Sequence, residues 1–152
     1  MGFKLPREAR EYYKLIDQKE NRFKLLFDKY YLCLLIGLNN NKLGKQSEYE
    51  IADFIEGYPQ SYTGKFPLII GLLINSEMER QGINAEDRSS VEELILQLIE
   101  TDSSTKLSEK GFELLNSYAA GGMNIIKDNI PKTGDIEIFL VAYHRLLNSN
   151  DF

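Results

Sequence analysis

The sequence predicts an all-α fold: a single compact multi-helix domain of about six or seven helices over residues 1–152. Apolar residues recur at helical spacing in five segments, whereas no run of four or more residues alternates between apolar and polar as a half-buried strand does. Hydrophobic residues make up 43% of the chain, and nine Tyr and eight Phe supply bulky core side chains in the absence of Trp. Residues 1–20 could form a peripheral N-terminal helix on this domain.

The first predicted element is a helix or a pair of helices over residues 7–38. Pro6 suits the first turn of a helix, because its missing N–H costs nothing there. A polar interval at residues 17–21 can interrupt the helix, and residues 23–38 then place apolar side chains three and four positions apart. Residues 30–36 are apolar on every side, so they must be covered by the rest of the domain or by a partner.

A short helix is predicted at residues 48–56, because Ser47 and Glu50 have the spacing of a capping box. Its apolar side chains, Ile51 among them, would face inward. The Gly- and Pro-containing stretch at residues 57–65 follows as the longest loop.

Residues 66–81 are predicted to form the third major helix. It ends at Gly82, because glycine readily adopts the left-handed backbone that closes a helix. Its first half is apolar on all sides, so we expect it to pack against residues 23–38 as the central helix pair. Gly71 in mid-helix costs about 1 kcal/mol relative to Ala. We therefore expect Gly71, and Gly37 in the earlier helix, to mark close helix crossings.

Three amphipathic helices follow, each opened by a residue whose side chain can accept hydrogen bonds from the first turn. Gly121 and Gly122 are expected to end the second of them, and a further short helix at residues 123–130 closes at Pro131. The capping residues and their helices are Asp87 before 91–100, Ser108 before 109–120 and Asp135 before 136–147.

The charge and hydropathy pattern favours a soluble, cytoplasmic protein without a membrane span. The net charge is −5, although residues 1–30 carry eight Lys or Arg and five Asp or Glu, interleaved with one another. Cys33 is the single cysteine, so no disulfide can form within the chain. No secretory signal peptide is visible, and the longest apolar runs are far shorter than the ~20 residues that a membrane span needs. Frequent Asn, Lys and Ile fit an AT-rich bacterial coding sequence.

No catalytic, cofactor-binding or metal site is predicted, and an enzyme is the least favoured class. His144 is the only histidine, and a Cys33–His144 pair is disfavoured because apolar surroundings raise the pKa of a thiol. Glu50, Asp53 and Glu56 share one face of the predicted short helix. No Glu-x-x-His motif accompanies them, as it does in helical carboxylate metal sites, so a solvated acidic face is the better interpretation.

The loop at residues 58–67 is the best candidate for binding a partner protein. It contains Tyr58, Tyr62 and Lys65, and tyrosine supplies a large contact area at low entropic cost. Nucleic-acid bases could also stack on these rings beside the lysine. The third interpretation is that both rings fold back over the ends of adjacent helices.

Tyr12 and Tyr13 pose the same choice between surface and core. Adjacent helical residues lie about 100° apart, so one of the two rings can face outward. The basic side chains of Arg7, Arg10 and Lys14 lie in the same segment. This segment could dock on a partner protein, or its cations could contact the phosphates of a nucleic acid.

These observations favour a non-enzymatic helical interaction subunit or adaptor of a bacterial multiprotein system, which binds a protein partner or forms a homo-oligomer. The style of the sequence alone suggests DNA processing or phage defence as its setting. The alternative is a nucleic-acid-binding domain that uses Arg7, Arg10 and Lys14 together with the loop at residues 58–65. The overall acidity of the chain counts against this alternative.

Overall fold

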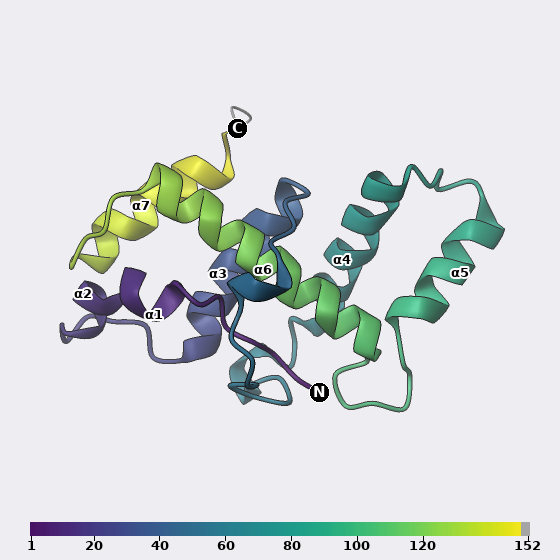
Figure 1. Ribbon diagram of the computed structural model, residues 1–152, viewed down its shortest axis with the longest axis horizontal. Helices are drawn as coiled ribbons and strands as arrows, with labels where there is room; N and C mark the ends of the chain where they lie inside the picture. The colour runs from purple at the N-terminus through teal and green to yellow at the C-terminus, as the bar shows by residue number, and fades with distance from the viewer. Residues whose placement is uncertain (150–152) are drawn as a thin grey trace.

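The computed structural model describes residues 1–149, and within this range the fold is all-α, with seven α-helices and no β-strand (Figure 1). The predicted fold class is confirmed. Two short 3-10 turns lie in the connections, η1 (Gln46–Glu48) and η2 (Gln60–Tyr62). The helices are α1 (Ala9–Tyr12), α2 (Lys14–Asp17), α3 (Leu26–Asn39), α4 (Phe66–Gln81), α5 (Arg88–Leu98), α6 (Glu109–Asn129) and α7 (Ile136–Leu147).

The centre of the molecule is the pair α3 and α6, which pack along each other more extensively than any other two helices. In Figure 1, α6 runs through the middle of the view, with α1, α2 and α7 on its left and α4 and α5 on its right. The sequence predicts that residues 66–81 pair with residues 23–38 at the centre. This prediction is wrong, because α4 contacts α3 much less extensively than α6 does.

Glycines in the two central helices permit this close packing. A Cβ atom on Gly37 of α3 would overlap the carbonyl oxygen of Tyr118, and one on Gly122 of α6 would overlap the carbonyl oxygen of Cys33. The predicted close crossing at Gly37 is confirmed. Gly121 and Gly122 do not end a helix, because α6 continues through them. Gly122 packs against α3, and Gly121 packs against the backbone of Lys42 and Leu43 just after α3. This close packing offsets the low helix propensity of two consecutive glycines.

The predicted helix at residues 48–56 is wrong. After η1 the backbone is extended and pairs with the N-terminal segment, so that the N–H of Phe3 donates to the carbonyl of Ile55 at 2.9 Å. Ile51, which was expected to face inward, is 82% exposed. Main-chain bonds to a segment more than forty residues away thus replace the local helical bonds. Two antiparallel bridges join these segments, Phe3 with Ile55 and Pro6 with Tyr49.

The prediction for α4 is correct in its boundaries and wrong about Gly71. Gly82 closes the helix with φ of 68°, in the left-handed region. A Cβ atom on Gly71 would meet nothing within 4 Å, so no close crossing exists there. Gly71 lies about 200° around the helix from the buried Ile69 and Leu73, and it therefore points away from the core.

The second half of α4 carries Glu77, a fully buried carboxylate. Glu77 accepts hydrogen bonds from the hydroxyl of Tyr118 at 2.6 Å, from two guanidinium nitrogens of Arg80 at 2.7 and 2.6 Å, and from Gln81 at 3.1 Å. Burial raises the pKa of Glu77, but these hydrogen bonds outweigh the burial and the net pKa is lowered. Glu77 is therefore ionised at neutral pH and links α4 to α6.

The N-terminal helices contribute to the core between α3 and α7. The ring of Tyr13 is buried, with its centroid 5.3 Å from that of Phe139 on α7. The ammonium group of Lys29 on α3 lies 2.6 Å from the carboxylate of Asp17 on α2. Residues 1–20, which were considered as a peripheral helix, therefore supply buried side chains to the central packing.

Candidate functional site

The loop at residues 58–65 folds onto the core. The side chain of Tyr62 is only 7% exposed, and its hydroxyl donates a hydrogen bond to Asp28 of α3 at 2.5 Å. Tyr58 is half-buried and donates to the carbonyl oxygen of Thr105 at 3.1 Å. The sequence left three interpretations of Tyr58 and Tyr62. The structure agrees with the one in which both rings fold back onto the core.

Lys65 lies on the surface of this loop. Its ammonium nitrogen is 5.3 Å from the ring centroids of both Tyr31 and Tyr62, within the range of a cation–π interaction. The other side chains that the loop presents to solvent, from Gln60, Ser61 and Thr63, are polar. The loop surface is therefore polar, and its aromatic area is turned inward.

Tyr12 and Tyr13 are both buried, with their ring centroids 4.9 Å apart. The hydroxyl of Tyr12 donates to the carbonyl oxygen of Ile130 at 2.7 Å. Burial raises the pKa of both phenols, so both are neutral at physiological pH. In this fold neither ring is available to a partner.

The three basic residues of the N-terminal region do not form a continuous positive surface. Arg10 forms a two-bonded ion pair with Glu50, at 2.9 and 3.2 Å. Arg7 donates to the carbonyl oxygen of Ser47 at 2.8 Å, and Lys14 is exposed. Two of the three side chains thus hold the N-terminal region against residues 47–50, which lowers their availability for phosphates.

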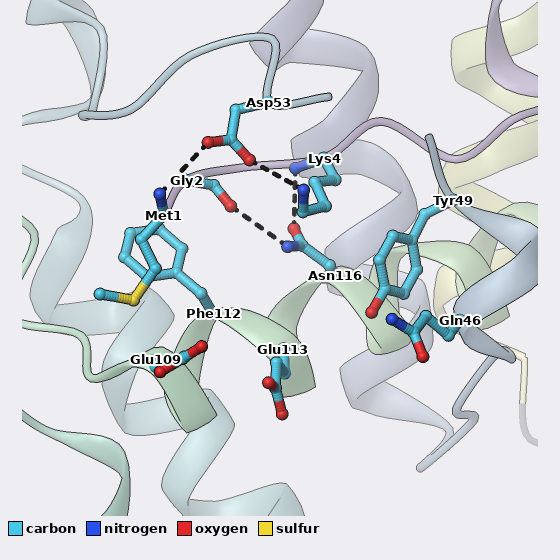
Figure 2. Close-up of a pocket in the computed structure, with 10 residues that line it drawn as sticks. All are labelled: Met1, Gly2, Lys4, Gln46, Tyr49, Asp53, Glu109, Phe112, Glu113 and Asn116. Carbon is cyan, nitrogen blue, oxygen red and sulfur yellow. Dashed lines mark hydrogen bonds and ion pairs between the residues drawn. The ribbon is translucent and has the colours of Figure 1, made fainter. Parts of the chain in front are cut away.

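A hollow of about 270 Å³ lies between the N-terminal segment, residues 46–53 and the start of α6 (Figure 2). Lys4 and Asp53 form an ion pair at 3.1 Å on one side. Glu109 and Glu113, one turn apart on α6, lie on the opposite side, as Figure 2 shows. Burial and the charge of Glu113 raise the pKa of Tyr49, which also lines the hollow.

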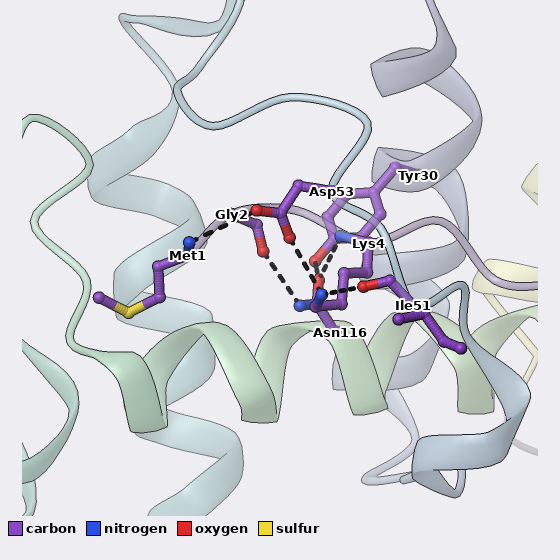
Figure 3. Close-up of polar contacts among 7 residues, drawn as sticks. All are labelled: Met1, Gly2, Lys4, Tyr30, Ile51, Asp53 and Asn116. Atoms are coloured by element: carbon purple, nitrogen blue, oxygen red, sulfur yellow. Dashed lines mark hydrogen bonds and ion pairs between the residues drawn. The ribbon is translucent and has the colours of Figure 1, made fainter.

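Asn116 organises the floor of this hollow (Figure 3). Its side-chain oxygen accepts from the backbone N–H of Lys4 at 2.9 Å and from the hydroxyl of Tyr30 at 2.8 Å. Its amide nitrogen donates to the carbonyl oxygen of Gly2 at 3.2 Å. One buried side chain therefore joins the N-terminal segment, α3 and α6.

The polar residues that line this hollow mainly hold the fold together. Its volume is just below the range of about 300–1,000 Å³ that is usual for ligand pockets. The charge of Asp53 is matched by Lys4, and the polar atoms of Asn116 are occupied by the chain itself. The carboxylates of Glu109 and Glu113 could hold a small cationic group at the rim.

The solvent side of α7 carries two exposed apolar side chains, Ile138 and Val141, three positions apart. We define the α7 face as Glu137, Ile138, Val141, His144 and Arg145. Ile138 is 61% exposed and Val141 is 52% exposed. At 100° per residue these positions lie opposite the buried side of the helix, and Leu140, which is 40% exposed, lies on the flank.

The buried side of α7 fixes which way the α7 face points. Phe139 and Tyr143 are buried, and the hydroxyl of Tyr143 donates to the carbonyl oxygen of Leu32 on α3 at 2.6 Å. The helix begins at Asp135, whose carboxylate accepts from the N–H of Glu137 at 2.9 Å and of Ile138 at 3.3 Å, as the sequence predicts. The helix is thus anchored on one side and capped at its start, which holds the opposite side in solvent.

The sequence already indicates that α7 has apolar residues on its solvent side. The apolar side chains expected to face inward on the predicted helix at residues 136–147 are Ile136, Phe139, Leu140, Tyr143, Leu146 and Leu147. Ile138 and Val141 are apolar but fall outside this stripe. Leu140, which that stripe includes, proves substantially exposed. The helix is apolar on more of its circumference than one buried side requires.

Leu96 on α5 is a second exposed apolar side chain, at 80%. Its neighbours one turn earlier on the helix surface are Glu92 and Glu93. The adjacent Ile95 is 37% exposed, but it lies about 100° around the helix from Leu96. Isolated apolar side chains are ordinary on a protein surface.

The two reactive side chains singled out in the sequence, Cys33 and His144, differ in their exposure to solvent. Cys33 is fully buried, as predicted, and burial raises the pKa of its thiol to about 12. His144 lies on the solvent side of α7. Within residues 1–149, no group of three or more His, Cys, Asp or Glu side chains is placed to hold a metal ion. None of the helices described here combines the length and apolar character needed to cross a membrane.

Comparison with family models, curated proteins and solved structures finds no match for this chain.

Proposed function

We propose that this protein is a non-enzymatic interaction subunit and that the α7 face is its contact surface for another protein. The observation that supports this proposal is the exposure of Ile138 and Val141 on the side of α7 opposite its buried anchors. Covering apolar area stabilises a complex by roughly 25 cal/mol per Å² before the costs of association. Neighbouring apolar side chains on a rigid helix are a common way to provide that area.

The proposal also includes the cellular process in which the protein acts. A bacterial multiprotein system, with DNA processing or phage defence as its process, is supported only by the composition of the sequence. A nucleic-acid-binding role is the less favoured candidate, because Arg7 and Arg10 are engaged by the chain's own oxygen atoms.

The test is quantitative capture of binding proteins from cells that naturally produce the chain. The double variant Ile138→Glu/Val141→Glu places two charges on the α7 face. The matched control, Ile51→Glu/Leu96→Glu, makes the same kind of change at two exposed positions elsewhere. We expect a defined protein, or a second copy of the chain, to be captured by the wild type and the control but lost with the α7 variant. Equal capture by all three would contradict the proposal.

A further inference from the structure

We infer that the α7 face binds the α7 face of a second copy, with the two helices antiparallel and Val141 at the two-fold axis. This inference rests on the proposed function and names its partner. A symmetric dimer needs one surface that is complementary to itself. The α7 face has this property, because it runs from an acidic end through apolar residues to a basic end.

The order of charges sets the direction of the pairing. In an antiparallel pair centred on Val141, the residue four positions before the centre lies opposite the residue four positions after it. These positions are Glu137 and Arg145, so each copy offers a carboxylate to the guanidinium group of the other. A parallel pair would instead place glutamate beside glutamate and arginine beside arginine, which is unfavourable.

The angular positions on the helix agree with this pairing. Relative to Val141, Ile138 and Arg145 lie on one side of the face and Glu137 and His144 on the other. In the two-fold pair, Glu137 of the second copy therefore lies beside His144 and across from Arg145. The aliphatic part of the arginine of the second copy covers Ile138, as long cationic side chains commonly do on apolar surfaces.

The charged groups at the two ends are open to such a partner. The ion pairs formed by residues 1–149 include neither Glu137 nor Arg145. Both side chains are exposed. The helix is about 18 Å long at 1.5 Å per residue, so the interface belongs to the small class below about 1,200 Å². Association is therefore expected to be weak and reversible.

The experiment is sedimentation equilibrium of the full chain from about 10 to 500 μM, which spans the dissociation constants expected for a small interface. The variants are Glu137→Arg, Arg145→Glu and the double reversal. Each single variant creates like-charge pairs and should weaken self-association at least about tenfold. The double reversal should restore it. A mixture of the two single variants should associate more tightly than either alone, because only the mixed dimer pairs opposite charges at both ends.

Circular dichroism melting of each variant is the control that checks whether the charge reversals leave the fold intact. Restored association in the double reversal and in the mixture supports the inference. A wild type that sediments as a monomer throughout, or single variants that associate like the wild type, overturns it. If the wild type is monomeric while Ile138→Glu/Val141→Glu loses capture of a different protein, only the second copy is wrong. If that variant also captures normally, the proposed function fails as well.

Discussion

Gly37 of α3 and Gly122 of α6 face each other at the closest approach of the two central helices. A Cβ atom on Gly122 would lie 2.9 Å from the backbone nitrogen of Gly37, and one on Gly37 would lie 3.1 Å from the backbone nitrogen of Gly122. Real Cβ atoms rarely approach so closely. The separation of α3 and α6, on which the fold is built, therefore depends on the absence of two side chains.

Replacing Gly122 by Ala should destabilise the fold strongly. The added methyl group would overlap the carbonyl oxygen of Cys33, which is backbone and cannot rotate away. Overpacking of this kind costs about 3 kcal/mol or more in the free energy of unfolding. Urea denaturation followed by circular dichroism measures the change.

The matched control is Gly71→Ala, the same substitution in mid-helix with open space around it. It should stabilise the protein by up to about 1 kcal/mol, because alanine is the better helix former. A Gly122→Ala variant as stable as the wild type would show that α3 and α6 are further apart than described.

Asn116→Leu should lower the free energy of unfolding, although leucine is nearly isosteric. The substitution leaves the hydroxyl of Tyr30 and the N–H of Lys4 without their acceptor, at roughly 1–3 kcal/mol for each buried group. Glu113→Gln, one turn earlier and exposed at the rim of the same hollow, should change stability by less than about 0.5 kcal/mol. Equal stabilities of the two variants would argue against the network in Figure 3.

Acid should remove the contribution of Glu77 to stability. Its pKa is lowered in the folded state, so its stabilisation is present above the unfolded pKa of about 4.3 and is lost as the pH falls through the folded value. The difference in unfolding free energy between the wild type and Glu77→Gln should therefore be largest near neutral pH and shrink towards pH ~3. A difference that does not vary with pH would mean that folding leaves the pKa of Glu77 unchanged, and a difference that shifts in favour of the wild type as the pH falls would mean that folding raises this pKa.

Substitution should destabilise the protein strongly on the buried side of α7 and hardly at all on its exposed side. Phe139→Ala removes a buried ring and should cost about 3–5 kcal/mol. Val141→Glu, two residues further on, changes a side chain that faces solvent and should alter monomer stability by less than about 0.5 kcal/mol at low protein concentration. Thermal melts of both variants test this, and a severe loss with Val141→Glu would place that residue in the core.

Much of the local structure could be predicted because its signals are local. The boundaries of α4 and α7 follow from Gly82 after one helix and Asp135 before the other. Asp87 and Ser108 cap α5 and α6 as expected, since their side chains accept from Ser90 and Gly111 in the first turn. These contacts span only a few residues.

The remaining errors have tertiary causes. Gly121 and Gly122 have the composition of a helix end, and only the carbonyl groups packed against them explain their place inside α6. Residues 48–56 lose their predicted helix to pairing with the N-terminal segment. Tyr62 and Tyr13 could not be assigned to core or surface, because a ring suits both and only the packed neighbours decide.

The most direct measurement is photo-crosslinking in cells that produce the protein, with a benzophenone amino acid placed at position 141 or, as the control, at position 51. Both sites are exposed, but only Val141 lies on the α7 face. A defined adduct from position 141 and none from position 51 is the predicted result, and an adduct of twice the chain's mass identifies a second copy. Absence of any adduct from position 141, at full expression and with the fold intact, would contradict the claim that the α7 face is where this protein meets another.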